Sequence, residues 1–283
     1  MMRPTAAAEW CASMTTFTHA IVRAPGDSFA DGLTEAGLGA PDLGLAREQH
    51  AAYCDALARC GVALTRLDAD ECFPDSTFVE DTAVLTANLA VLAQPGAPSR
   101  AGEVDSVAGA VRGFFRRIAS IAPPGTLDGG DVCQAGDHFF IGLSRRTNLA
   151  GAAQLIALLE AEGFTATTID IRPSPTLLHL KSGISWIGRD TIVLGPELAA
   201  EPALRKFARL VVEPGESYGA NCVAINDHVL IPAGHDALER SLSHAGFGAI
   251  PLHVSEFRKM DGGLSCLSLR FADPPNDGRA ARV

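Results

Sequence analysis

The sequence predicts a closed α/β domain built from repeated units that are related by pseudo-symmetry. Three segments share one pattern, in which an amphipathic helix is followed by a glycine and then by a short alternating strand; the glycines are Gly61, Gly163 and Gly246. Their spacing is about twice a period of 40 to 50 residues, which leaves room for more divergent copies between them. About five such units would fill the chain, so we expect one pseudo-symmetric domain rather than two separate ones.

The remaining strands fit the same arrangement. Short segments bounded by Gly, Pro, Asn or Asp lie at 17–24, 82–94, 138–143, 191–195 and 222–232. The Pro- and Gly-rich joints at 95–100, 122–130 and 213–221 are too short to be interdomain linkers. We therefore predict a single folded domain over 17–274, preceded by a disordered extension at 1–16 and followed by a flexible tail at 275–283.

Composition limits the classes of function. The 283 residues include 33 acidic and 23 basic side chains, and the net charge of −10 argues against a nucleic-acid surface or an anionic membrane as partner. The acidic excess suits a small cationic ligand. No apolar stretch reaches the roughly 20 residues that cross a bilayer, and residues 1–16 contain one Arg and no sustained apolar core of a signal peptide.

The seven cysteines form an odd set without a C-x-x-C pair or a histidine at zinc-finger spacing. We interpret them as reduced thiols of a cytoplasmic protein, and we expect neither a metal nor another cofactor. Cys133 and Cys222 fit packing positions. Cys266 is different, because it follows the acidic, glycine-containing turn 261–263 and precedes an apolar run, so it is either a small core residue or an exposed nucleophile.

Polar residues stand at comparable places in the three recognisable units. Asp75, His179 and Asp261, the last followed by Cys266, come about 15 residues after the glycines at the helix ends. If a rotation axis relates the units, these positions converge near that axis. An acid, a base and a thiol would then share one central pocket, which a nucleophilic mechanism requires.

Four polar islands, at 75–85, 127–148, 177–188 and 259–271, carry the chemical interpretation. Taken singly, each has a structural explanation: His179 lies in an apolar run typical of a core histidine, Asp128 could end a turn, and the acids of 75–81 could form a solvated face. Taken together, one thiol, one imidazole and one carboxylate match a Cys-His-acid arrangement. In such a set the acid orients the imidazole and the imidazole moves protons.

The islands also resemble a known family. The motifs DSTFVEDTAV, LDGGDV with GLSRRTN, HLKSG and DGGLSC, in this order over about residues 17–271, are similar to those of the dimethylarginine dimethylaminohydrolases, which belong to the amidinotransferase or pentein superfamily. The resemblance implies the pentein fold, a five-bladed pseudo-symmetric β/α propeller with its active site on the central axis. It also implies metal-free hydrolysis of methylated arginine to citrulline and methylamine or dimethylamine.

The same resemblance implies roles for individual residues. Cys266 would be the nucleophile, His179 the general acid and base, and Asp128 the carboxylate that orients His179. The cationic end or the α-amine of the substrate would be held by four acids, of which the second and third would bind the guanidinium: Asp75, Glu80, Asp81 and Asp261.

The resemblance further implies how the amino-acid end of the substrate is held. Arg100 and Arg146 would bind its α-carboxylate, with Arg145 as a competing candidate. Main-chain carbonyls near Phe29 and Met260 would complete the site for its α-amine. The family position near Phe29 is commonly leucine, so this chain departs from the family pattern at that contact.

The predicted chemistry has physical support. A guanidinium is planar and positively charged, so paired carboxylates both hold and orient it. Without that cation the same carboxylates disfavour a nearby thiolate, and we therefore expect Cys266 to be a neutral thiol until substrate binds. A covalent thiouronium intermediate on Cys266 would follow, and water activated by His179 would release citrulline.

Two other interpretations stay open. The first is an arginine or agmatine deiminase, or a hydrolase of another guanidino or ureido amino acid. Such an enzyme would differ from a methylarginine hydrolase in the volume of the substrate pocket, where one methyl changes the binding free energy by only about 1 to 3 kcal/mol. Two arginines for an α-carboxylate disfavour agmatine. A non-catalytic protein that binds arginine-like ligands is the second interpretation, which the complete set of Cys266, His179 and Asp128 disfavours. The exposed rim of such a propeller is compatible with a homodimer.

Overall fold

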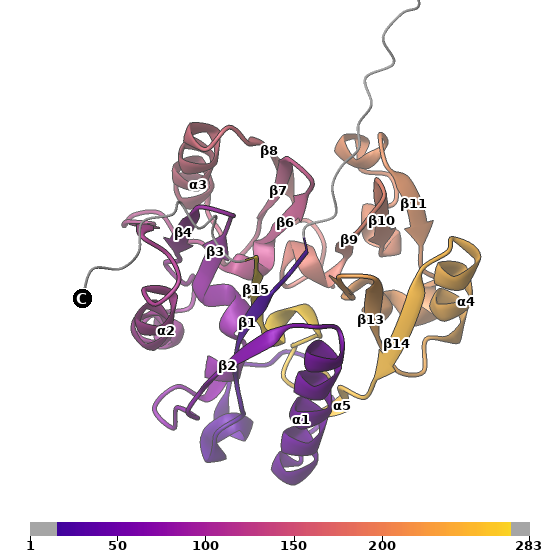
Figure 1. The fold of residues 1–283 in the computed structure, drawn as a ribbon, viewed down its shortest axis with the longest axis horizontal. Helices are drawn as coiled ribbons and strands as arrows, with labels where there is room; N and C mark the ends of the chain where they lie inside the picture. Colours follow the sequence, from indigo (N-terminus) through magenta and orange to yellow (C-terminus); the bar gives the residue numbers. More distant parts are fainter. Residues whose placement is uncertain (1–15, 273–283) are drawn as a thin grey trace, which may run out of the picture.

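The computed structural model describes residues 16–272 and arranges them as small sheets around a central axis (Figure 1). Within this range there are five sheets of three strands each. The strands, given sheet by sheet in hydrogen-bonded order, are β15 (Leu269–Phe271), β1 (His19–Arg23) and β2 (Ala63–Leu67); β3 (Ala83–Leu85), β4 (Leu89–Leu92) and β5 (Arg117–Ser120); β6 (Val132–Ala135), β7 (His138–Leu143) and β8 (Thr165–Asp170); β9 (Ile184–Gly188), β10 (Thr191–Leu194) and β11 (Ala208–Val211); β12 (Val223–Ile225), β13 (His228–Pro232) and β14 (Gly248–Leu252).

Every sheet has the same internal topology. Its middle strand runs antiparallel to the first strand, through a hairpin or, at β1, by pairing with β15, and parallel to the third. Parallel neighbours need a crossover connection. Helices provide it in four sheets, namely α1 (Leu43–Arg59), α2 (Glu103–Val111), α3 (Leu149–Ala161) and α4 (Asp236–His244), and they lie on the outside of the ring in Figure 1. The predicted five-bladed α/β propeller is therefore the fold.

The last strand closes the ring. In β15, Phe271 pairs with His19 and Leu269 pairs with Ile21 of β1, so the C-terminal strand completes the first blade. The short helix α5 (Ser255–Arg258) and the following turn precede this strand. The position of Cys266, just before β15, is thus fixed by pairing with the N-terminal strand of the domain.

The repeat predicted from the sequence is confirmed at three helix ends. Gly61, Gly163 and Gly246 follow α1, α3 and α4 with φ of +85°, +89° and +79°, the left-handed conformation that ends a helix at glycine. The other two copies lack this feature. Gly113 after α2 has no positive φ, and the crossover between β10 and β11 contains the 3-10 turns η7 (Pro196–Leu198) and η8 (Pro202–Leu204) in place of an α-helix.

Apolar packing on the outside leaves the axial ends of the inner strands to polar residues. For example, Leu155 and Leu159 of α3 are fully buried in one cluster with Phe139 and Ile141 of β7. The six cysteines described are free. None of the helices described within 16–272 has the length and apolarity to span a membrane. The extension predicted for 1–16 lies, apart from Thr16, outside the described residues, as does the tail predicted for 275–283.

Candidate active site

Short turns that lead into the inner strands carry the polar islands. The turns are η3 (Val79–Thr82) before β3, η5 (Gly129–Asp131) before β6, η6 (Leu180–Ser182) before β9 and η10 (Ser265–Leu267) before β15. They lie in contact in the order η10, η3, η5 and η6. Segments that are far apart in the chain therefore deliver their side chains to the same end of the propeller axis.

His179 and Asp128 form the acid and imidazole pair expected from the sequence. His179 Nε2 lies 3.0 Å from Asp128 Oδ2, and both side chains are buried. The other oxygen of Asp128, Oδ1, accepts a hydrogen bond of 2.8 Å from the backbone N–H of Gly96. The carboxylate is consequently fixed, and it can hold the imidazole in one orientation.

Surrounding carboxylates make His179 a stronger base than an ordinary histidine. Burial alone lowers the pKa of His179, but the negative charges of Asp81, Asp131 and Asp128 outweigh it and raise the pKa to about 9. Asp81 Oδ1 lies 4.0 Å from His179 Nε2. Asp131 was not among the predicted site residues; it is the second acid of LDGGD, and it accepts hydrogen bonds from Leu180 N and Ser144 Oγ. At neutral pH the imidazole is therefore protonated.

The two glycines of LDGGD allow this close approach. A Cβ atom at Gly130 would lie 2.7 Å from Asp81 Oδ1 and 2.8 Å from His179 Nδ1, closer than real Cβ contacts. A Cβ atom at Gly129 would overlap the backbone carbonyl of Glu80. The backbone N–H of Gly130 instead donates a hydrogen bond of 2.8 Å to Asp81 Oδ1. Only glycine therefore lets this turn pack directly against the two catalytic islands.

Cys266 is a buried thiol in an acidic environment. It is 9% exposed, and its Sγ accepts a hydrogen bond of 3.4 Å from the backbone N–H of Gly263. Burial, followed by the negative charges of Glu80 and Asp81, raises the pKa of the thiol to about 12, although the Gly263 N–H and Lys181 act in the opposite direction. This agrees with the expectation that the free thiol is neutral.

Asn221 and Glu80 hold the turn that carries Cys266. Asn221 Oδ1 accepts a hydrogen bond from Ser265 N at 2.9 Å, and Asn221 Nδ2 donates to Ser265 Oγ at 3.2 Å. Ser265 Oγ in turn donates to Glu80 Oε2 at 2.8 Å. Sequence reasoning missed Asn221, and the available signal was its place two residues before β12, the inner strand of the fifth unit. This residue fixes the backbone on which the thiol stands.

Arg100 contacts protein groups that the sequence did not reveal. Its Nη1 donates to Asp81 Oδ2 at 2.6 Å, and Nε and Nη2 donate to both carboxylate oxygens of Glu103. Nη2 also donates to the carbonyls of Asp75 and Phe78. Because all three nitrogens of this buried guanidinium already donate hydrogen bonds to protein groups, the geometry favours a role for Arg100 in holding Asp81. Its assignment to a substrate carboxylate stays a prediction.

The choice between Arg145 and Arg146 has a structural answer. Arg145 is exposed and forms an ion pair of 2.8 Å with Glu35. Arg146 is half-buried, and its Nη1 is buried without a hydrogen-bond partner among the described residues. A buried cationic donor without a partner is ready for an anionic ligand group. These contacts favour Arg146 over Arg145 for an α-carboxylate.

A lid segment, residues 33–36, covers two of the predicted binding acids. The backbone N–H of Leu33 donates to both carboxylate oxygens of Asp75, at 3.1 and 3.2 Å, and the N–H of Glu35 donates to Asp261 Oδ2. Thr34 Oγ1 donates to the carbonyl of Lys259 at 2.7 Å. Asp75 and Asp261 thus face the lid backbone, where a substrate amine would have to compete with or displace these amides.

The side chain of Phe29 belongs to the core. Phe29 is 1% exposed, and its ring packs against Phe78 and Phe257 in an apolar cluster that also includes Met260. Its side chain is therefore a core group. The backbone N–H that contacts Asp75 comes from Leu33, four residues further along the chain. The roles of the carbonyls of Phe29 and Met260 stay predictions.

Asp81, Asp128 and His179 also form a compact buried group that could hold a metal ion, since one ligand atom from each lies within 4.8 Å of the others. The charges in this group are already balanced, because Arg100 pairs with Asp81 and the protonated His179 pairs with Asp128. We therefore interpret the group as acid–base machinery.

Comparison with known proteins agrees with this interpretation. The family model described as arginine deiminase matches residues 113–216. The chain is 41% identical over 256 residues to the N(G),N(G)-dimethylarginine dimethylaminohydrolase of Pseudomonas aeruginosa, covering 90% of this chain and 100% of that one. It is 37% identical to the protein of the same name from Streptomyces coelicolor, covering 90% of this chain and 97% of that one.

Solved structures give the same result. The Pseudomonas aeruginosa enzyme, in a mutant with serine in place of a cysteine and complexed with citrulline, has a TM-score of 0.88 and 40% identity over 90% of this chain and 100% of that one. The fold and the site thus define an enzyme of the pentein superfamily. More narrowly, the relationship extends over the whole length of the bacterial relatives. The chain belongs to the dimethylarginine dimethylaminohydrolase family.

Proposed function

We propose that this protein hydrolyses Nω-methylated L-arginine, asymmetric dimethylarginine or monomethylarginine, to L-citrulline and dimethylamine or methylamine. The observation that carries the proposal is the buried thiol of Cys266 beside Glu80 and Asp81, in a site that also contains the paired His179 and Asp128. The carboxylates supply the negative charge that a guanidinium needs, and the imidazolium supplies the proton that an amine leaving group needs.

Substrate binding follows from the charges of the site. The guanidinium is held by Glu80 and Asp81, while Arg146 takes the α-carboxylate at the other end of the substrate. Asp75 and Asp261 bind the α-amine, and the lid backbone that now donates to them moves to admit it. Asp81 stays ionised because the charge of His179 and the guanidinium of Arg100 hold its pKa at about 2 against the effect of burial. Glu103 acts on Arg100, whose guanidinium it holds in place.

In the proposed reaction, Cys266 and His179 each give up one proton and later take one back. The bound cation lowers the pKa of Cys266, whose proton leaves to solvent, and the thiolate attacks the guanidinium carbon. The resulting tetrahedral adduct expels dimethylamine or methylamine when His179 gives the leaving nitrogen a proton. Neutral His179 next takes a proton from water, and the hydroxide adds to the thiouronium carbon. The C–S bond then breaks, and the hydroxyl proton passes to the departing sulfur, so that citrulline and the neutral Cys266 thiol are released.

A second activity is kept as a candidate because residues 113–216 match the arginine deiminase family model. Arginine would undergo the same steps with ammonia as leaving group. The two activities differ in the space next to one nitrogen of the guanidinium, where a methyl group is worth about 1 to 3 kcal/mol.

The proposed function is tested by product release from four substrates measured side by side: asymmetric dimethylarginine, monomethylarginine, arginine and agmatine. The ureido product is quantified in each case, and the released amine is identified. We expect citrulline and the methylated amines from the first two. Citrulline from arginine alone would move the protein to the deiminases, and turnover of agmatine would contradict the assignment of an α-carboxylate site.

The pH dependence should follow the two shifted groups. With pKa values of about 12 for Cys266 and about 9 for His179, the free enzyme at neutral pH holds a thiol and an imidazolium. Ultraviolet titration should show no thiolate at neutral pH, and kcat/KM should fall as His179 loses its proton near pH 9. A free-enzyme thiolate already present at neutral pH would contradict this prediction.

The shift of His179 also predicts a change in stability. Its folded pKa of about 9 lies above its ordinary value of 6.5, so protonation favours the folded state. This contribution is complete below pH 6.5 and is lost as the pH rises through about 9. The thermal midpoint should decline over that window in the wild type, and it should decline less in His179→Asn. Equal slopes in the two proteins would contradict the prediction.

Arg146→Ala should raise KM for dimethylarginine while kcat changes little, because the α-carboxylate does not change during the reaction. A charged hydrogen bond is worth about 1.5–3 kcal/mol, which corresponds to about a 10- to 100-fold effect. Arg145→Ala is the matched control, and its exposed ion pair with Glu35 predicts a change of at most a few fold. A larger effect at Arg145 than at Arg146 would reverse the assignment.

A cytosolic location and a homodimeric state stay predictions. The proposed partner of the protein is the small cationic amino acid itself.

A further inference from the structure

A cavity with a volume of about 1160 Å³ lies along the propeller axis, on the side of the inner strands away from the thiol. Its walls come from the inner strands β3, β6, β9, β12 and β15. Its lining extends to residues that follow these strands, namely Thr86, Gly136, Asp190, Asn226 and Ala272, whereas the catalytic turns precede the strands. The lining also reaches the catalytic turns at Glu80, Gly129, Lys181 and Ser265, but it includes neither Cys266 nor His179. We therefore infer that the cavity opens on the face of the ring away from that thiol.

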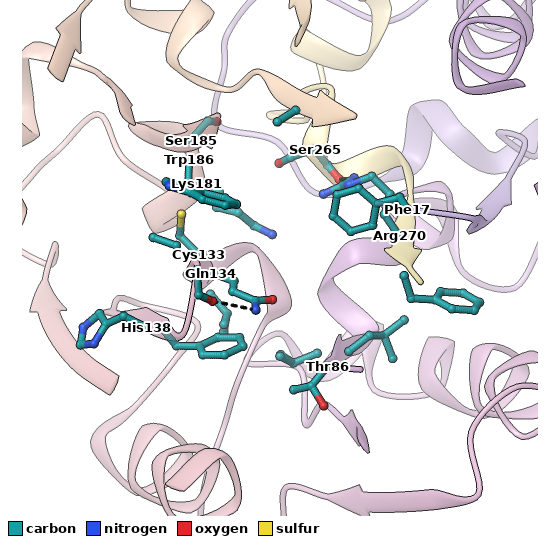
Figure 2. A pocket seen from close by; sticks show the side chains of 18 of the residues that line it. Phe17, Thr86, Cys133, Gln134, His138, Lys181, Ser185, Trp186, Ser265 and Arg270 are labelled. Carbon is teal, nitrogen blue, oxygen red and sulfur yellow. Dashed lines mark hydrogen bonds between the residues drawn. The ribbon is translucent and has the colours of Figure 1, made fainter. Parts of the chain in front are cut away.

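The floor of the cavity carries an excess of positive charge. Lys181 Nζ and Arg270 Nη2 both approach Glu80 Oε1, at 2.6 and 3.1 Å. Figure 2 shows the two basic side chains extending from opposite sides of the cavity. The side chain of Lys181 is 16% exposed and that of Arg270 14%. Two cations share one carboxylate, so among the described residues one positive charge on this floor has no ion-pair partner of its own.

The walls are mostly apolar and aromatic. Trp186 lies beside Lys181 in Figure 2, and the lining also includes Phe17, Phe139, Phe207 and Leu269. The other charged residues of the lining, apart from the floor group and the partly buried His138, are exposed at the mouth: Asp137, Asp190 and Lys206. They are screened by water, whereas the floor charges are largely buried, so the floor decides which ligand is preferred.

We propose that this cavity binds a small amphiphilic monoanion, in which one carboxylate is attached to an aromatic or aliphatic body. The carboxylate pairs with Lys181 and Arg270, and the body lies against Trp186 and the phenylalanines. Apolar walls with a few convergent polar groups are the usual composition of a small-molecule site. A cationic pair in a largely buried floor favours a carboxylate through charge-assisted hydrogen bonds.

The site is coupled to the catalytic centre through Glu80. One oxygen of Glu80 accepts from Lys181 and Arg270 in the cavity floor, and the other accepts from Ser265, the residue before Cys266. An anion that draws the two cations away leaves Glu80 less neutralised, and it adds its own negative charge. Both effects disfavour the Cys266 thiolate. The bound anion therefore slows turnover without occupying the substrate site.

Benzoate titration with tryptophan fluorescence tests this inference in the full-length protein. The chain has two tryptophans, Trp10 and Trp186, so Trp186→Phe keeps an internal emitter and should lose the response. We expect saturation by benzoate in the wild type and an affinity about tenfold lower in Lys181→Gln. Lys206→Gln, which removes an exposed lysine at the mouth of the same cavity, is the matched control and should bind benzoate as the wild type does.

The outcomes separate anion recognition from other binding. Benzamide, which has the same shape without the charge, should give no saturable response; an equal response to it would overturn the proposal, as would unchanged affinity in Lys181→Gln. Saturating citrulline should leave benzoate binding in place, and full competition would move benzoate to the active site. Because binding is measured without turnover, the result does not depend on the proposed reaction.

Discussion

Replacing Cys266 with alanine should lower kcat for dimethylarginine by about 10⁴-fold or more, because no other group in the site can form the covalent intermediate. Binding of substrate should persist, since Glu80, Asp81 and Arg146 are unchanged. Citrulline release and equilibrium binding of substrate to the variant check the two parts of this prediction separately.

Cys222→Ala is the matched control for that variant. Cys222 is also buried, and burial likewise raises the pKa of its thiol to about 12, but it packs in the apolar cluster between the fourth and fifth blades. We expect near wild-type turnover with a loss of stability of about 1 kcal/mol. Comparable inactivation of both variants would mean that Cys266 acts through folding, and the assignment of a nucleophile would fail.

Replacing His179 with asparagine should lower kcat for methylated arginine by about 10²- to 10⁴-fold, the range for loss of a general acid. The loss should depend on the leaving group. S-methyl-L-thiocitrulline releases methanethiol, which leaves without a proton from the imidazole, so the variant should still form the covalent adduct with it. Hydrolysis of that adduct also needs His179, and the adduct should therefore accumulate.

The control for this variant is His50→Asn, which changes a buried histidine outside the site. His50 is 6% exposed and contacts Cys54 and Phe257, and burial lowers its pKa to about 4, so it is neutral at the pH of the assay. Turnover should stay near the wild-type value. An equal loss for both substrates in His179→Asn, with no accumulated adduct, would show that His179 supports the fold and does not protonate the leaving group.

The parts of the fold that depend on a local conformational requirement could be predicted from the sequence. Gly61, Gly163 and Gly246 take a left-handed backbone at the ends of helices, and that requirement made three of the five units visible. The second unit ends its helix without such a glycine, and the fourth replaces the helix with 3-10 turns. Closure of the ring by β15 and β1 depends on pairing between the two ends of the domain, which no local pattern records.

The candidate site divides in the same way. The catalytic residues Cys266, His179 and Asp128 could be proposed from the sequence. A thiol, an imidazole and a carboxylate are characteristic residue types, and each lies in a motif that contains glycine. Groups that position them act through tertiary contacts with ordinary side chains. Asn221 holds Ser265, which lies 44 residues further along the chain, and this contact does not follow from local spacing. Glu103, by contrast, accepts hydrogen bonds from two nitrogens of Arg100 at an i,i+3 spacing, so this pair was open to prediction from the sequence.

The lid shows the limit most clearly. Phe29 and Leu33 lie four residues apart in one segment, and the resemblance indicated the first of them. Only the folded structure shows that Phe29 enters the core while the backbone of Leu33 meets Asp75. The contact of Leu33 could not be predicted from side-chain type, because a backbone amide makes it.

The covalent step on Cys266 is the central claim, and intact-protein mass spectrometry of acid-quenched reactions tests it most directly. Wild-type enzyme mixed with dimethylarginine should show a transient mass gain equal to the substrate minus dimethylamine. Peptide mapping should place that gain on Cys266, and His179→Asn with S-methyl-L-thiocitrulline should show the same group persisting. Steady citrulline production with unmodified Cys266 at every quench time, and no adduct in the histidine variant, would contradict the account.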